Sequence, residues 1–216
     1  MKYKLLIFCL LVACQLSVHA NTVWTRYEDG VFVSFVSVHV KCPMSVADAV
    51  VDDLIDQFRG DPQLLFEWAF KDLGKQSHDD SKNEVLIELK EVNFDKMTGI
   101  SRLLTDIVVP GFTTYKDIAI ESKVVKEKLD KGITRVSVDI FYSNALLKKA
   151  YGTFFVVPIS ADSVMMSVKI HVRFGWFFNM FITKNRYRNL VEWRQQGFMN
   201  NMRDESERRA LKGMRK

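Results

Sequence analysis

The histidines are the side chains of this chain best suited to move protons or bind a metal, and they lie far apart. Beyond residue 20 they are His39, His78 and His171. The sequence contains no GxSxG, HExxH or CxxC string and no glycine-rich phosphate loop. We therefore predict no catalytic residue and no cofactor. Acids and bases can meet in space without a motif, so an enzyme stays open as a third hypothesis.

One short segment has metal-binding residue types. His78, Asp79 and Asp80 follow one another within a polar stretch, residues 75–83. Three adjacent residues on a loop make a poor chelate, and no other histidine is near in sequence. We therefore predict no metal site.

Residues 1–20 have the three parts of a secretory signal peptide. Two lysines precede an apolar run from Leu5 to Leu16, and Val18-His19-Ala20 provides a cleavage site. The run is shorter than the roughly 20 residues that span a bilayer. We therefore expect an exported protein, periplasmic or secreted, whose mature chain is a single domain over residues 21–216. The lipobox-like string LVAC leaves lipidation at Cys14 as an alternative.

Cleavage after Ala20 would leave Cys42 as the last of the three cysteines. One cysteine cannot close an internal disulfide, so the fold must depend on packing. We expect Cys42 to be a small buried apolar residue, as free cysteines usually are.

Positive charge gathers at the C-terminal end. Residues 184–216 hold ten Lys and Arg against four Asp and Glu, within a chain of net charge +5. Such asymmetry is typical of a surface that meets an acidic partner, although a solvated helix face has the same composition. Arg203, Arg208 and Arg209 are the candidate contacts with a partner or an anionic membrane. We predict no nucleic-acid partner, because an exported protein rarely meets nucleic acid.

Hydrophobic periodicity indicates an α+β chain. Alternation with a period of two predicts strands, and apolar residues three to four apart predict helices. The expected strands are residues 31–40, 84–94, 116–126, 133–142, 149–159 and 163–174. The expected helices are 46–58, capped by Ser45, then 62–73, capped by Asp61, and finally 185–209, with a frayed tail over 210–216. The segment 95–114 is ambiguous between one or two helical turns over 100–109 and a strand over 106–112.

This order resembles the START-like, helix-grip superfamily of polyketide-cyclase and lipid-transport type. The resemblance covers residues 31–209 and concerns the order of elements, since no signature string of that family is present. It implies a curved antiparallel sheet with two short helices after the first strand and one long C-terminal helix. The family has six strands after the helix pair, so the sixth must come from residues 95–114.

What the resemblance implies for function is a cavity between sheet and last helix that holds a hydrophobic small molecule or lipid. The candidate lining residues are the inward strand residues and the helix residues that would face them: Val136, Val138, Ile140, Met166, Val168, Ile170, Leu190, Val191 and Phe198. The same apolar stripes also suit a solid core. The alternative function is a cell-envelope interaction protein without a ligand, whose basic helix docks on a partner or an anionic membrane.

Overall fold

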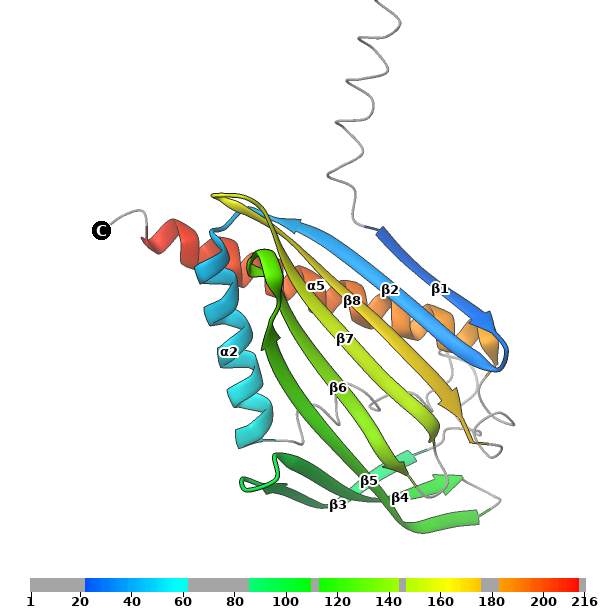
Figure 1. The fold of residues 1–216 in the computed structure, drawn as a ribbon. Helices are drawn as coiled ribbons and strands as arrows, with labels where there is room; N and C mark the ends of the chain where they lie inside the picture. The colour runs from blue at the N-terminus through cyan, green and yellow to red at the C-terminus, as the bar shows by residue number, and fades with distance from the viewer. Residues whose placement is uncertain (1–21, 62–85, 110–112, 144–146, 176–182, 214–216) are drawn as a thin grey trace, which may run out of the picture.

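The structure is a computed structural model, and it describes residues 22–61, 86–109, 113–143, 147–175 and 183–213. Its strands form one antiparallel sheet of eight strands in the order β1-β2-β8-β7-β6-β5-β4-β3 (Figure 1). The strands are β1 (Thr22–Glu28), β2 (Val31–Val40), β3 (Leu86–Asp95), β4 (Ile100–Val109), β5 (Thr113–Lys128), β6 (Thr134–Ser143), β7 (Leu147–Ser160) and β8 (Ser163–Phe174).

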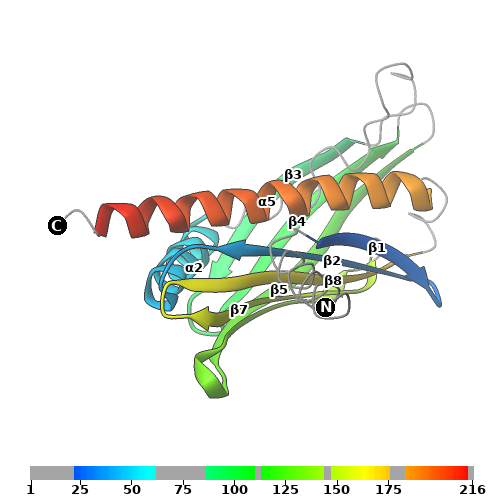
Figure 2. The same cartoon turned by 90° about the horizontal axis from the view of Figure 1, so that it is seen from above.

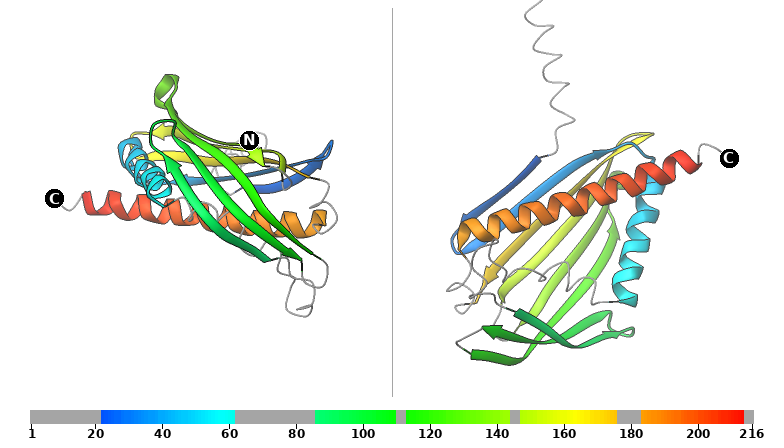
Figure 3. Two further views of the ribbon diagram at one scale, coloured as in Figure 1. Left: turned by 90° about the horizontal axis from the view of Figure 1, so that it is seen from below. Right: turned by 180° about the vertical axis from the view of Figure 1, so that it is seen from behind.

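Two helices lie on the same side of this sheet. Helix α2 (Met44–Gly60) follows β2, and helix α5 (Lys184–Gly213) follows β8. At 30 residues, α5 is roughly 45 Å long. It crosses the strands diagonally on the concave side, while α2 stands at one edge of that side (Figures 2 and 3). The sheet therefore curves around α5, which lies on its concave face.

The alternation of side chains along the strands explains which face is buried. On β2 every second residue from Phe32 to Val40 is buried, including Ser34. On β8 Val164, Met166, Val168 and Phe174 are buried. An antiparallel sheet that packs on one face needs this alternation, so the inward direction predicted for Met166 and Val168 is confirmed.

Several predicted elements are confirmed with small shifts, one open alternative is decided, and three details are wrong. Of the two alternatives for residues 95–114 the strand is correct, although it spans Ile100–Val109, so the sheet has its sixth strand after the helices. Helix α2 begins at Met44 after Pro43, and no side chain among the described residues caps it, so Ser45 is not the N-cap. An additional edge strand, β1, was not predicted. Helix α5 continues to Gly213 and Ala210 is buried, so fraying does not begin at Ala210.

Some predictions concern residues that the structure does not describe. These are the leader 1–20 with Cys14, the second helix 62–73, the polar segment with His78 to Asp80, and residues 214–216. Within the ranges given above, no helix has the length and apolar character to cross a membrane.

Two groups of buried side chains share the inside of the sheet. One joins Phe32, Leu103, Ile107 and Phe174 with Tyr187 of α5. The other joins β2, α2 and the C-terminal half of α5, and it contains Cys42.

Burial, with a smaller contribution from Glu207, raises the pKa of the Cys42 thiol to about 11. Cys42 is therefore an unreactive packing residue, as expected.

Candidate ligand site

A cavity of about 220 Å³ lies inside the curve of the sheet, between its inner face and the helices α2 and α5. The β-strands β4 to β8 form its wall, one face of α2 closes one side, and the N-terminal half of α5 covers it. The side chains that reach it from the helices are Val51, Leu54, Ile55 and Phe58 of α2 and Tyr187, Leu190, Val191, Arg194 and Phe198 of α5.

Gly152 on β7 accounts for part of this space. It pairs with Val138 on β6 and Ile170 on β8, and both neighbours point into the cavity. A Cβ atom built at Gly152 would lie 3.7 Å from Ile170 Cγ1, an ordinary contact distance. A side chain would therefore fit at this position and project into the cavity. The glycine leaves the middle of the wall open where neighbouring strands carry valine and isoleucine.

Eight of the nine candidate lining residues come together at this cavity. They are Val136, Val138, Ile140, Val168, Ile170, Leu190, Val191 and Phe198. Met166 is fully buried in the second core group and is not among the lining residues. That any of these side chains touches a ligand stays a prediction.

Sequence reasoning missed the contribution of α2, and also Gly152 and Arg194. The helical spacing of Val51, Leu54, Ile55 and Phe58 was available as a signal, because residues three and four apart share one helix face. Nothing in that spacing tells whether the face packs on a wall or borders a cavity.

The described lining is almost wholly apolar. Arg194, half-buried, is its one formally charged residue, and Asp, Glu, His, Cys and Lys are absent from it. Tyr151 and Tyr187 add phenolic groups to this lining. Predominantly apolar walls with a few polar groups are typical of small-molecule sites.

Tyr187 fixes the N-terminal end of α5 above the cavity. Its ring centroid lies 4.3 Å from that of Phe32 and 5.2 Å from that of Phe174. Burial raises the pKa of its hydroxyl, and a hydrogen bond with Ser34 partly opposes that shift. The side chain is therefore neutral at any physiological pH, and its ring is part of the apolar wall.

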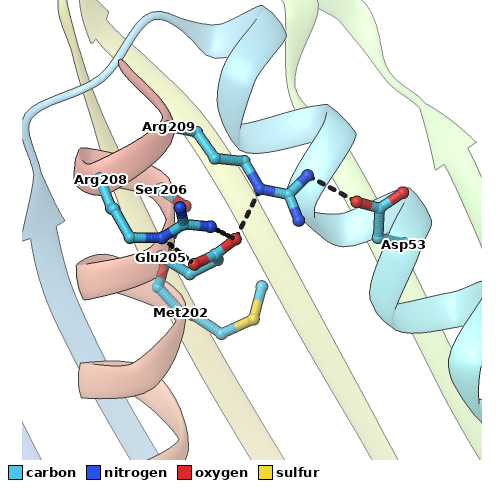
Figure 4. A network of polar contacts seen from close by, with 6 residues as sticks. All are labelled: Asp53, Met202, Glu205, Ser206, Arg208 and Arg209. Atoms are coloured by element: carbon cyan, nitrogen blue, oxygen red, sulfur yellow. Dashed lines mark hydrogen bonds and ion pairs between the residues drawn. The ribbon is translucent and has the colours of Figure 1, made fainter. Parts of the chain in front are cut away.

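The three arginines predicted to meet a partner or membrane lie at the other end of α5, and each pairs with an acid of the same chain. Arg208 donates two hydrogen bonds to Glu205, of 2.7 and 2.6 Å. Arg209 bridges Glu205 and Asp53 of α2, at 2.7 and 2.5 Å (Figure 4). Arg203 pairs with Asp204 at 3.0 Å. Arg209 thus connects α5 to α2, whereas Arg208 and Arg203 pair within α5. The contact of these arginines with a partner or a membrane stays a prediction.

One histidine of the described residues, His171, is in contact with an aromatic ring. His171 of β8, one of the three separated histidines, stacks on the Tyr151 ring at a centroid distance of 4.2 Å. Burial lowers its pKa, and Lys169 and Lys149 lower it further.

Across the described ranges, no group of three or more His, Cys, Asp or Glu is placed to hold a metal ion.

Comparison with known proteins gives structural similarity without sequence similarity. No protein-family model matches the chain. No curated protein sequence matches it either. Among solved structures, it is similar to the Zhui aromatase/cyclase from Streptomyces, with 13% identity, a TM-score of 0.45, and coverage of 83% of this chain and 95% of that one. It is also similar to a STAR-related lipid transfer protein from Xanthomonas axonopodis, with 15% identity, a TM-score of 0.43, and coverage of 86% and 98%.

Similarity at this level carries no statement about ligand or reaction. The strand order β2-β8-β7-β6-β5-β4-β3, with helix α2 after β2 and the long α5 across the concave face, is this chain's own topology. Along the chain, the described elements follow one another in the order that the resemblance implies, with β1 added before β2. The chain therefore has a START-like, helix-grip fold.

Proposed function

We propose that the protein binds a hydrophobic small molecule or lipid in the cavity beneath the N-terminal half of α5. The observation that carries this proposal is the apolar lining of a space of about 220 Å³. Water is poorly held in such a space because it finds too few hydrogen-bond partners. An apolar ligand would cover this apolar surface, and burial of apolar surface contributes roughly 25 cal/mol per Å².

The test compares one substitution at two positions. Val138→Phe places a ring in the cavity, whereas Val125→Phe places the same ring on the outer face of β5, where Val125 is exposed. The measurement is titration with N-phenylnaphthylamine, an apolar dye that fluoresces when it leaves water. We expect the wild type and Val125→Phe to bind the dye equally, and Val138→Phe to bind it at least about tenfold more weakly, the equivalent of about 1.4 kcal/mol.

Equal binding by all three proteins would refute the cavity as the binding site. Gly152→Leu provides a second filling variant, since its Cβ fits the wall without a clash. Circular dichroism melting of each variant separates loss of binding from loss of fold. Native mass spectrometry of the wild type then identifies the ligand that copurifies.

We also propose that this binding takes place outside the cytoplasm. The support is the signal-peptide pattern of residues 1–20. Intact mass spectrometry of the protein from its native host checks it. A mature chain that begins at Asn21 is the expected result, and a lipid-modified chain that begins at Cys14 would show anchoring instead. A chain that retains residues 1–20 contradicts export by cleavage.

A further inference from the structure

The wall of the cavity carries a serine, Ser122, within apolar surroundings. Along β5 its inward neighbours are Ile120 and Val124, and across the β5–β6 pair it lies opposite Ile140. All three of these neighbours line the cavity, as Ser122 does. Ser122 is only 2% exposed, so its hydroxyl has no access to bulk water.

The backbone is irregular at this residue. The register between β5 and β6 shifts between Glu121 and Ser122, as in a β-bulge. Bulges occur beside binding and active sites because the extra residue changes the direction of a side chain. Here Glu121 pairs with Tyr142 and Ser122 pairs with Ile140, so the extra residue is Phe141 of β6. The bulge therefore lies on β6, directly opposite the β5 segment that carries Ser122.

Further hydroxyls lie beside it on β4. Ser101 is buried and pairs directly with Ser122 across the β4–β5 register. Thr105 is farther along the same inner row and is fully buried, with an Oγ1 that has no hydrogen-bond partner among the described residues. The inner face of β4 and β5 therefore holds three hydroxyls, of Ser101, Thr105 and Ser122, which we call the hydroxyl strip. Of these three residues, Ser122 is the one that lines the cavity.

A hydroxyl in an apolar wall costs free energy unless a partner meets it. Ser122 is the one serine of the described cavity lining, and its hydroxyl can donate one hydrogen bond and accept two. An alanine or valine would complete the wall without that cost. The serine is accounted for if the partner arrives with the ligand.

We propose, on the basis of the binding function above, that the ligand is an apolar molecule with one neutral oxygen, a hydroxyl or a carbonyl, which hydrogen-bonds to Ser122. A neutral group fits better than an anion at this wall. Ser122 offers a neutral hydroxyl, and the apolar lining residues Leu103 and Ile120 beside it would penalise a charge. The charged side chain of the lining, Arg194, belongs to α5 and not to the sheet.

The experiment uses eight-carbon probes that differ in one group. Octanol, octanone, chlorooctane and octanoate each compete with bound N-phenylnaphthylamine on the wild type, Ser122→Ala and Ser137→Ala. Ser137 lies on the neighbouring strand β6 and is not a lining residue, so it is the matched control. We expect octanol and octanone to bind the wild type more tightly than chlorooctane. In Ser122→Ala that preference falls by about fivefold, the usual size of one neutral hydrogen bond.

The other outcomes separate this inference from the proposed function. If octanol and chlorooctane bind equally and Ser122→Ala changes neither, the hydroxyl inference is overturned while the cavity remains a binding site. If octanoate binds most tightly and Arg194→Gln abolishes that preference, the ligand is an anion and the inference is overturned. If no probe displaces the dye, the proposed function fails as well. Ser122→Cys, which keeps the side-chain size, repeats the test if the alanine variant does not fold.

Discussion

In the C-terminal half of α5, Met199, Met202 and Ala210 are buried in one core group with β2 and α2, whereas Leu190 and Val191 in the N-terminal half stay half-buried above the cavity. Both halves belong to one continuous helix, so the difference comes from what lies beneath them. The C-terminal half meets closely packed valines of β2 and α2. The N-terminal half spans a space that the sheet leaves open.

This contrast assigns a separate task to each half. The C-terminal half fixes the position of α5 by packing and by the ion pairs to Asp53 and within the helix. The N-terminal half lies over the cavity as its roof, and Tyr187 in the first turns of the helix packs against Phe32 of the sheet. A roof that is held at both ends can line a cavity without filling it. Stability and ligand binding should therefore respond to different substitutions along the same helix.

The largest expected effect is on stability, and it tests that separation. Met199→Ala removes a fully buried side chain from the packed half and should lower the free energy of unfolding by about 2–5 kcal/mol. Leu190→Ala should cost less, roughly 1–2 kcal/mol, because Leu190 is half-buried and borders a space that already exists. Urea denaturation followed by circular dichroism gives both values.

Dye binding provides the complementary half of this test. Leu190→Ala should change the affinity for N-phenylnaphthylamine, whereas Met199→Ala should leave it unchanged under conditions where that variant is folded. Equal stability losses, or an affinity change confined to Met199→Ala, would contradict the division of α5 into a packed half and a roof.

The sequence allowed more of the sheet to be predicted than of the cavity, for physical reasons. Strand β8 alternates between apolar and polar residues from Met166 to Phe174, so the inward direction of Met166, Val168 and Ile170 was predicted correctly. Strand β4 was ambiguous because its inner row contains the polar residues Ser101 and Thr105, while Leu104 is on the other face and only half-buried. Ser101 and Thr105, which made the strand hard to recognise in the sequence, are two members of the hydroxyl strip.

Hydrophobic periodicity could not predict the cavity. An apolar stripe has the same pattern whether it meets another side chain or a space, and the resemblance alone raised the idea of a cavity. Met166 packs in the core whereas Val168 borders the cavity, and both are apolar inward residues of β8. Their residue types therefore do not tell which of them borders the cavity. Packing depends on the distance between layers, and the length and angle of α5 set that distance.

An effect of intermediate size is expected at the boundary between the two halves. Gln195 is fully buried on α5, and neither its Oε1 nor its Nε2 atom has a hydrogen-bond partner within the described chain. An unpaired buried amide is costly, so Gln195→Met, of similar shape, should raise the free energy of unfolding by about 1 kcal/mol. Thermal melting measures the change. A loss of stability would show instead that the amide is satisfied by a bound water or ligand, and the two halves would then be joined by a polar contact.

The smallest effect concerns the ion pairs at the surface of the packed half. Hydrogen bonds from Arg208 and Arg209 lower the pKa of Glu205 from 4.5 to about 2. A carboxylate with a lowered pKa in the folded state stabilises it at pH values above 4.5, and this contribution disappears as the pH falls from 4.5 to 2. About a third of the Glu205 side chain is exposed, so solvent screening limits the contribution to less than about 1 kcal/mol.

Glu205→Gln isolates this contribution because the other carboxylates of the protein are unchanged. We expect the free energy of unfolding of the wild type to fall more steeply than that of the variant between pH 4.5 and 2, and added salt to reduce the difference. Parallel pH profiles would show that the ion pairs contribute nothing measurable. The packed half of α5 would then be held by Met199 and its neighbours alone, because burial in the core does not titrate in this range.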